Sequence, residues 1–125
     1  PDGVLAYRSE AGGTSLVFAT DVEHGDALDP RLLRACEGVD LLIHDAQYTD
    51  AEYEGRAGPS RRGWGHATWR QATDVAVEAA VHRLDLYHHD PTRDDAGVDR
   101  IEALARQRFA PTRAAREGAL LAVGG

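Results

Sequence analysis

The 125-residue sequence contains a single cysteine, Cys36, and has neither methionine nor lysine. One cysteine excludes an internal disulfide bond and any zinc site built from several cysteines. It also fits a reducing compartment, so we expect a cytoplasmic protein. The absence of an initiator methionine at Pro1 suggests a fragment or a processed product.

Long apolar runs are also missing, since none approaches the roughly 20 residues that a membrane-spanning helix needs. Residues 1–10 lack the basic region and apolar stretch of a secretory signal. The formal net charge of −7 disfavours a passive nucleic-acid coat, because phosphate binding depends on dense cationic surface. No P-loop, G-x-G-x-x-G or G-x-S-x-G occurs, which removes the commonest nucleotide-binding and serine-hydrolase signatures.

The alternation of apolar and polar segments predicts one layered α/β domain over residues 1–125. Residues 3–10 and 14–21 are β-rich runs separated by Ala-Gly-Gly, which predicts an antiparallel hairpin. The other expected elements are a helix from Pro30 after the N-cap Asp29, a buried strand over 39–46, a helical turn and loop over 50–65, a helix that starts near His66, a strand over 83–90, a helix over 94–109 and a last strand over 118–123.

Polar residues gather where the expected strands end, and these are Asp21, Asp45, His66 and His88. Asp21 could bind a cation or could merely form a turn. Only one of His88 and His89 can face a given site, because strand side chains alternate, and that imidazole could bind a metal or be solvated. With a carboxylate nearby, His66 could act as a proton donor, or else His66 or Thr68 merely caps the helix.

The polar segment 50–65 carries Arg56, Arg61 and Arg62, which could hold a phosphate or could simply be solvated. Loops of this length in compact domains are often functional. We expect His24 and His82, by contrast, to be solvated surface residues.

Four segments, taken in order, together resemble the C-terminal half of metallo-β-lactamase-fold hydrolases: SLVFATDVEHG, VDLLIHDAQYTDAEY, GWGHATWRQA and RLDLYHHDPTRDD. They look most like the branch that contains ribonuclease Z and the cyclic phosphodiesterases related to phosphonate metabolism. This resemblance implies half of an αββα sandwich, a mixed sheet with an N-terminal hairpin and helices on one face. It also implies a site for zinc or manganese in which Asp21 and His88 are ligands and His89 is a neighbour.

The same resemblance implies that Asp45 and His66 form a catalytic pair that protonates the leaving oxygen, although the family's acidic residue there is commonly glutamate. The family's H-x-H-x-D-H motif does not occur in this sequence. Asp21 and His88 alone would leave the metal site incomplete, so we expect this chain to be inactive by itself. We also expect its exposed sheet to bind a second copy or the missing N-terminal half.

Hydrolysis of a phosphodiester by metal-activated water is the function that the resemblance implies, on a cyclic phosphate, a nucleotide or an RNA end. The acidic surface favours a small cyclic phosphate or nucleotide over tRNA. The alternative is a non-catalytic α/β interaction domain that pairs through its exposed sheet, which the missing motif favours. A third is a receiver-like domain phosphorylated on Asp21 or Asp45, but the expected hairpin argues against it, because receiver sheets are wholly parallel.

Overall fold

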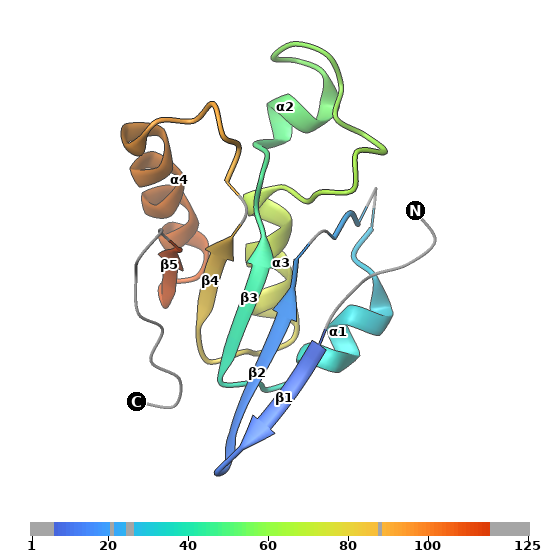
Figure 1. Cartoon of the computed structure of the whole chain (residues 1–125), viewed down its shortest axis with the longest axis vertical. Coiled ribbons are helices and arrows are strands. Elements are labelled where there is room, and N and C mark those ends of the chain that lie inside the picture. The colour runs from blue at the N-terminus through green and yellow to red at the C-terminus, as the bar shows by residue number, and fades with distance from the viewer. Residues whose placement is uncertain (1–6, 21, 25–26, 88, 116–125) are drawn as a thin grey trace.

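The computed structural model describes residues 7–20, 22–24, 27–87 and 89–115, which form a five-stranded mixed sheet covered by helices (Figure 1). The strands are β1 (Tyr7–Ala11), β2 (Thr14–Ala19), β3 (Leu41–Asp45), β4 (Leu84–Tyr87) and β5 (Thr112–Ala114), in that spatial order. The helices are α1 (Pro30–Cys36), α2 (Asp50–Glu54), α3 (Trp69–Glu78) and α4 (Asp95–Arg108). Only β1 and β2 pair antiparallel, and each later strand pairs parallel with its neighbour.

The hairpin and the first helix form as the sequence predicts. Gly12 and Gly13 join β1 to β2 with φ of 59° and 81°, a backbone region that favours glycine. Asp29 caps α1 by accepting a hydrogen bond from the Arg31 amide, and Pro30 occupies the first helical turn. These confirmed predictions depend on local chemistry alone.

Thr68 is the N-cap of helix α3. Its hydroxyl accepts a hydrogen bond from the Gln71 amide, and the Gln71 side chain accepts one from the Thr68 amide. The cap is therefore Thr68, and His66 lies two residues before it. Of the two residues that could have capped this helix, His66 remains available for another role.

The C-terminal side of the sheet differs from the expectation. Strand β5 was not predicted, because three residues carry no periodicity, yet the Leu84 amide donates to the Pro111 carbonyl at 2.9 Å. The Arg113 guanidinium also donates to the fully buried Asp85 carboxylate at 3.1 Å. The strand expected over residues 118–123 lies outside the described residues.

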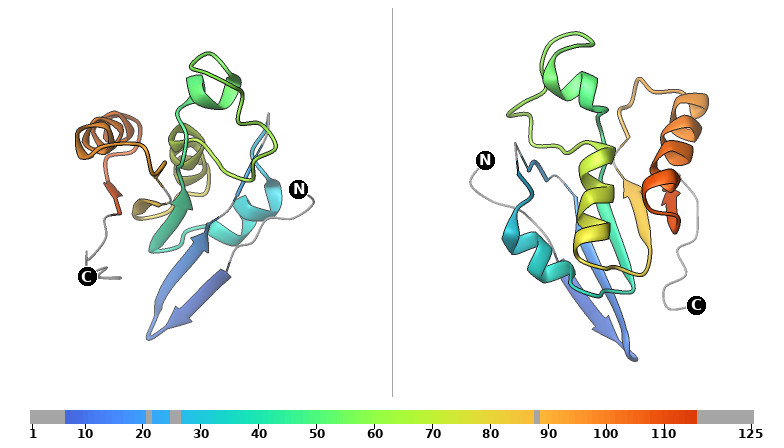
Figure 2. Two further views of the ribbon diagram at one scale, coloured as in Figure 1. Left: turned by 45° about the horizontal axis from the view of Figure 1, so that its top comes forward. Right: turned by 180° about the vertical axis from the view of Figure 1, so that it is seen from behind.

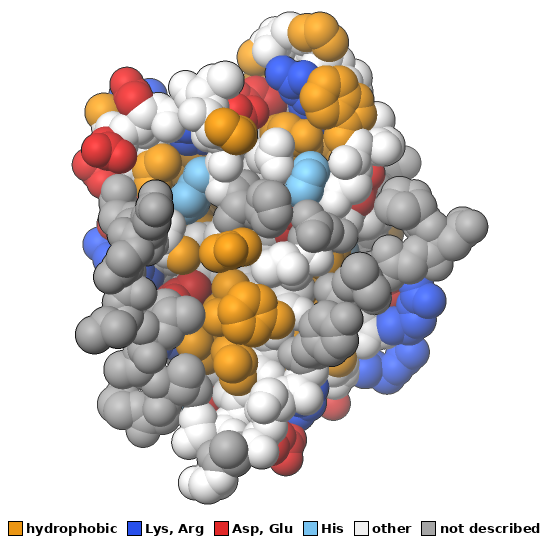
Figure 3. All heavy atoms as spheres, in the orientation of Figure 1, with side chains coloured by type: hydrophobic (Ala, Val, Ile, Leu, Met, Phe, Trp, Pro, Cys, Tyr) orange, Lys and Arg blue, Asp and Glu red, His pale blue; other side chains and the backbone are white. Residues whose placement is uncertain are grey.

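Helices α1, α3 and α4 all lie on one face of the sheet, as expected (Figures 1 and 2). The buried core between helices and sheet includes Val17, Leu32, Leu42, Val75, Leu84, Leu86 and Ile101. On the face seen in Figure 3, hydrophobic side chains gather over the strands, and Phe18 and Tyr87 contact edge to face while 36% and 43% exposed. Within the described ranges, no helix is long and apolar enough to cross a membrane.

Two valines on α3 provide a matched test of this packing. Val75 is fully buried and Val77 is 55% exposed. Val75→Ala is expected to lower the free energy of unfolding by about 2 kcal/mol, from two lost methyl groups and the cavity that remains. Val77→Ala makes the same change in helix propensity. It should shift the free energy of unfolding by less than about 0.5 kcal/mol. Urea denaturation measures both, and equal losses would contradict the packing of α3 through Val75.

Candidate functional site

Strands β2, β3 and β4 are parallel and end at the same edge of the sheet. The register pairs Ala19 with His44 and Asp45 with Tyr87. Carboxyl ends of parallel strands are where α/β sheets commonly place ligands. Asp21 and His88, the expected metal ligands, follow β2 and β4 in the sequence but lie outside the described residues.

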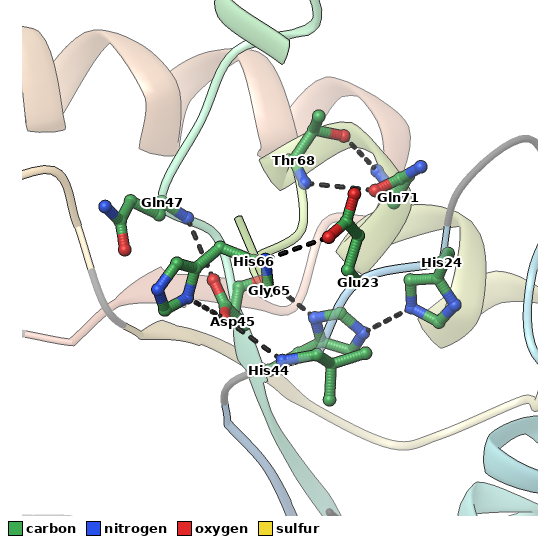
Figure 4. Close-up of polar contacts among 10 residues, drawn as sticks. Glu23, His24, His44, Asp45, Gln47, Gly65, His66, Thr68 and Gln71 are labelled. Carbon is green, nitrogen blue, oxygen red and sulfur yellow. Dashed lines mark hydrogen bonds and ion pairs between the residues drawn. The ribbon is translucent and has the colours of Figure 1, made fainter. Parts of the chain in front are cut away.

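Asp45 and His66 are in direct contact, as the sequence led us to look for. His66 Nδ1 lies 2.7 Å from Asp45 Oδ2, and the Asp45 carboxylate is fully buried (Figure 4). An ionised carboxylate only accepts hydrogen bonds, so Nδ1 carries the proton and donates it. The His66 side chain is 19% exposed, so the ring lies between the buried carboxylate and the surface.

Two backbone amides also donate to the Asp45 carboxylate. The Val22 amide donates to Oδ2 and the Gln47 amide to Oδ1, each at 3.2 Å. A buried charge is costly unless donors surround it, and here they come from the segment after β2, the segment after β3 and the segment before α3. The carboxylate thus holds three chain segments together at the sheet edge.

Backbone pairing explains why His66 reaches Asp45 across 21 positions of sequence. Tyr48 and Thr68 form an isolated parallel bridge, in which the Tyr48 amide donates to the Ala67 carbonyl at 3.3 Å. The Trp69 amide donates to the Tyr48 carbonyl at 3.0 Å, and the Tyr48 ring meets the His66 ring edge to face. The segment that enters α3 is therefore fixed against the segment that leaves β3.

Glu23 is a site residue that the sequence analysis missed. Its carboxylate accepts a hydrogen bond from the Gly65 amide at 2.8 Å (Figure 4). The Gly63 amide at 2.6 Å and the Tyr53 hydroxyl at 2.7 Å also donate to it. Partial burial raises the pKa of this carboxyl, but the hydrogen bonds outweigh burial and leave its pKa below the usual value. No local signal could have revealed it, because its amide partners lie 40 and 42 positions away.

The prediction that His24 is solvated is wrong, whereas His82, with a side chain 69% exposed, is solvated as expected. His24 stacks on His44 with the two Nε2 atoms 3.0 Å apart (Figure 4). The Asp29 amide donates to His24 Nδ1 at 3.1 Å, so that ring must carry its proton on Nε2. His24 Nε2 then donates to His44 Nε2, and His44 Nδ1 donates to the Asp45 carbonyl at 2.7 Å.

This arrangement needs both rings neutral. Burial lowers the pKa of His24 to about 4, against the opposing charges of Asp29 and Asp74. Burial, then the neighbouring His24, lowers the pKa of the fully buried His44 to about 3. His44 therefore faces the helix side as a neutral ring, while Asp45, the next residue, is a carboxylate bound to His66.

Among the described residues, no group of three or more His, Cys, Asp or Glu side chains could hold a metal ion. The Asp45 carboxylate is engaged on both oxygens by protein donors, so its geometry fits a residue that orients His66. The described residues do not make up a metal centre by themselves.

Substitution of Glu23 tests its hold on the loop before His66. Glu23→Gln places a side-chain NH2 group, which can only donate, against the Gly63 and Gly65 amides, which also donate. It is expected to lower the free energy of unfolding by about 1–3 kcal/mol. Amide exchange at Gly63 and Gly65 should accelerate. Glu54→Gln, which removes only an exposed pair with Arg56 at 3.3 Å, should change stability by less than about 0.5 kcal/mol. Unchanged exchange in Glu23→Gln would contradict the contact.

Acid should destabilise the fold through His24 and His44. Both pKa values are lower in the folded chain than the ordinary 6.5, so the unfolded chain binds more protons below that pH. Stability is expected to be full above pH 6.5 and to fall between pH 6.5 and 5, by roughly 1.4 kcal/mol per pH unit for each histidine. Urea unfolding measured over pH 5–7 checks this, and His24→Phe should reduce the slope. A stability independent of pH would contradict neutral burial of the pair.

Comparison with known proteins agrees with this architecture. Ribonuclease Z from Brevibacillus brevis is 34% identical over 109 residues, which cover 82% of this chain and 31% of that protein. The metallo-beta-lactamase fold protein YhfI from Bacillus subtilis superposes with a TM-score of 0.72 at 20% identity, over 95% of this chain and 44% of that one. A diphosphatase from the PhnP family gives 0.58 at 17% identity, over 87% and 35%.

The chain thus spans less than a third of the length of the ribonuclease Z that it matches. Its mixed sheet with an N-terminal hairpin and helices on one face is a partial metallo-beta-lactamase fold, which confirms the expected fold class. The sequence model of the beta-lactamase superfamily domain matches residues 1–89, and the chain belongs to this superfamily.

Proposed function

We propose that this chain is part of a phosphodiester hydrolase in which His66 delivers a proton to the leaving oxygen. The observation that carries the proposal is the 2.7 Å contact of His66 Nδ1 with a fully buried carboxylate. The similarity to a protein named ribonuclease Z, whose name denotes cleavage of RNA, supports a phosphodiester as the substrate. A small cyclic phosphate or nucleotide suits the acidic surface of the chain better than tRNA does.

The chemistry of the pair follows from its geometry. Asp45 fixes the ring through Nδ1, so Nε2 is the nitrogen through which the ring passes a proton. In the proposed step the His66 imidazolium passes its Nε2 proton to the departing oxygen as the P–O bond breaks. The Val22 and Gln47 amides also donate to the Asp45 carboxylate and help to hold it against the ring.

Asp21 and His88 are proposed as ligands of a divalent ion, zinc or manganese, on the strength of the family to which the chain belongs. When bound, such an ion supplies Lewis-acid polarisation of the phosphoryl group and an activated water. Their sequence positions support this role, because Asp21 comes two residues after β2 and His88 comes directly after β4, and both strands end near Asp45.

Two substrates whose leaving groups differ in their need for a proton distinguish proton donation by His66 from its other possible roles. In the full product of the gene that encodes this sequence, His66→Ala is expected to lower kcat on 2′,3′-cyclic AMP by about 10²–10⁴-fold. The loss on bis(p-nitrophenyl) phosphate should be much smaller, because p-nitrophenolate departs without a proton. His82→Ala, a matched change at an exposed histidine, should leave both rates unchanged.

Equal losses of His66→Ala on the two substrates would contradict a role as general acid, and no loss on either would remove His66 from the mechanism. Metal content measured on the same proteins gives a second result. His88→Ala should retain less zinc or manganese than the unchanged protein, while His66→Ala should retain as much.

Association through the open face of the sheet is the second candidate, and the exposed Phe18 and Tyr87 favour it. A second copy of the chain or a complementary half-domain would cover this face, as sheets lacking a second layer require. A gene product that binds no divalent metal and hydrolyses neither substrate would favour this binding role over catalysis.

A further inference from the structure

The loop between α2 and His66 is basic in an acidic chain. Residues 55–65 contain three arginines and no acidic residue, whereas the whole chain has a net charge of −7. Arg56 pairs with Glu54 at 3.3 Å, and the Arg62 guanidinium lies over the Tyr53 ring at 4.9 Å from its centroid. The Arg61 guanidinium lies over the indole of Trp64, 4.4 Å from the ring centroid.

Trp64 is unusually exposed for its size. It is 55% exposed, and it stands between Gly63 and Gly65, whose φ values of 83° and 90° favour glycine. Both flanking amides donate to the Glu23 carboxylate, at 2.6 and 2.8 Å. The indole is therefore presented by an anchored turn, and binding to it costs little ordering of the loop.

The Arg61–Trp64 pair precedes the proposed proton donor in the loop that Glu23 anchors. Trp64 is two residues from His66 in the sequence, and its amide donates to the Arg61 carbonyl at 3.2 Å. The Tyr48 ring contacts the His66 ring edge to face at 6.0 Å. Figure 3 shows basic and hydrophobic side chains side by side at the end of the molecule that carries α2.

We propose that Arg61 and Trp64 form a binding subsite for a nucleotide, in which the base stacks on the Trp64 indole and Arg61 contacts a phosphate. The subsite rests on the proposed function, because it makes the substrate at His66 a nucleoside phosphodiester. Indole rings stack on any base, and guanidinium groups match phosphate geometry. A phosphoester without a base would lack the stacking contact.

Binding to the 125-residue chain tests the subsite without turnover, because the probe, AMP, is a monoester. The chain has two tryptophans, and Trp69 packs against the core, so its indole N–H signal in NMR spectra is an internal control. AMP should shift the Trp64 indole N–H and leave that of Trp69 in place. Trp64→Ala should weaken AMP binding roughly 5- to 150-fold and leave the weaker binding of ribose 5-phosphate unchanged.

Matched arginine variants separate the phosphate contact from general charge. Arg61→Gln should weaken the binding of both AMP and ribose 5-phosphate. Arg56→Gln removes an arginine already paired with Glu54 and should leave the binding of both ligands unchanged. Equal affinity of Trp64→Ala and the unchanged chain for AMP would overturn the subsite, as would an AMP titration that leaves the Trp64 signal in place.

The two proposals fail separately. A gene product with His66-dependent hydrolysis but without the Trp64 shift would overturn the subsite and keep the proposed function. A Trp64-dependent affinity for AMP in a protein without phosphodiesterase activity would support the nucleotide subsite and overturn the catalytic role of His66.

Discussion

Burial of the Asp45 carboxylate is the constraint on which the site depends. A charge without exposure to water is tolerable only with several donors around it, and this one receives hydrogen bonds from Val22, Gln47 and His66. The three donors belong to separate segments of the chain, so satisfying one carboxylate brings the ends of β2 and β3 and the approach to α3 together. The same contacts set the proton on His66 Nδ1, so Nε2 is the nitrogen that acts in the proposed proton transfer.

A second carboxylate extends this arrangement outward. Val22 donates its amide to Asp45, while the next residue, Glu23, accepts from the loop that precedes His66. The short segment after β2 is thus joined to the α3 approach twice, once through each carboxylate. A loop with several glycines can present an exposed indole in a defined place because Glu23 holds its amides. The proposed nucleotide subsite and the proposed proton donor therefore depend on the same anchored segment.

Adjacent residues of β3 carry a neutral ring on one face of the sheet, at His44, and a carboxylate on the other, at Asp45. His44 points to the helix side, where His24 and the backbone of Asp29 and Asp45 fix both imidazoles as neutral rings. Asp45, one position later, presents its charge to His66 on the other side. Alternation along a strand makes this separation possible, because neighbouring side chains leave opposite faces. The two histidines connect the start of α1 to the sheet.

Sequence alone determined the features that depend on neighbouring residues. The glycine hairpin, the Asp29–Pro30 helix start and the order of four motifs were enough to predict the mixed sheet, the superfamily and the Asp45–His66 pair as candidates. Only the tertiary structure decided the hydrogen bonds of Glu23, the stacking of His24 on His44 and the pairing of β5. Each of these depends on contacts with segments distant in sequence, 40 and 42 positions for Glu23 and 20 for His24, which leave no periodicity or motif to detect. Contacts between neighbouring residues determined the hairpin and the start of the first helix. Burial of the Asp45 carboxylate among donors from separate segments determined how those segments form a site.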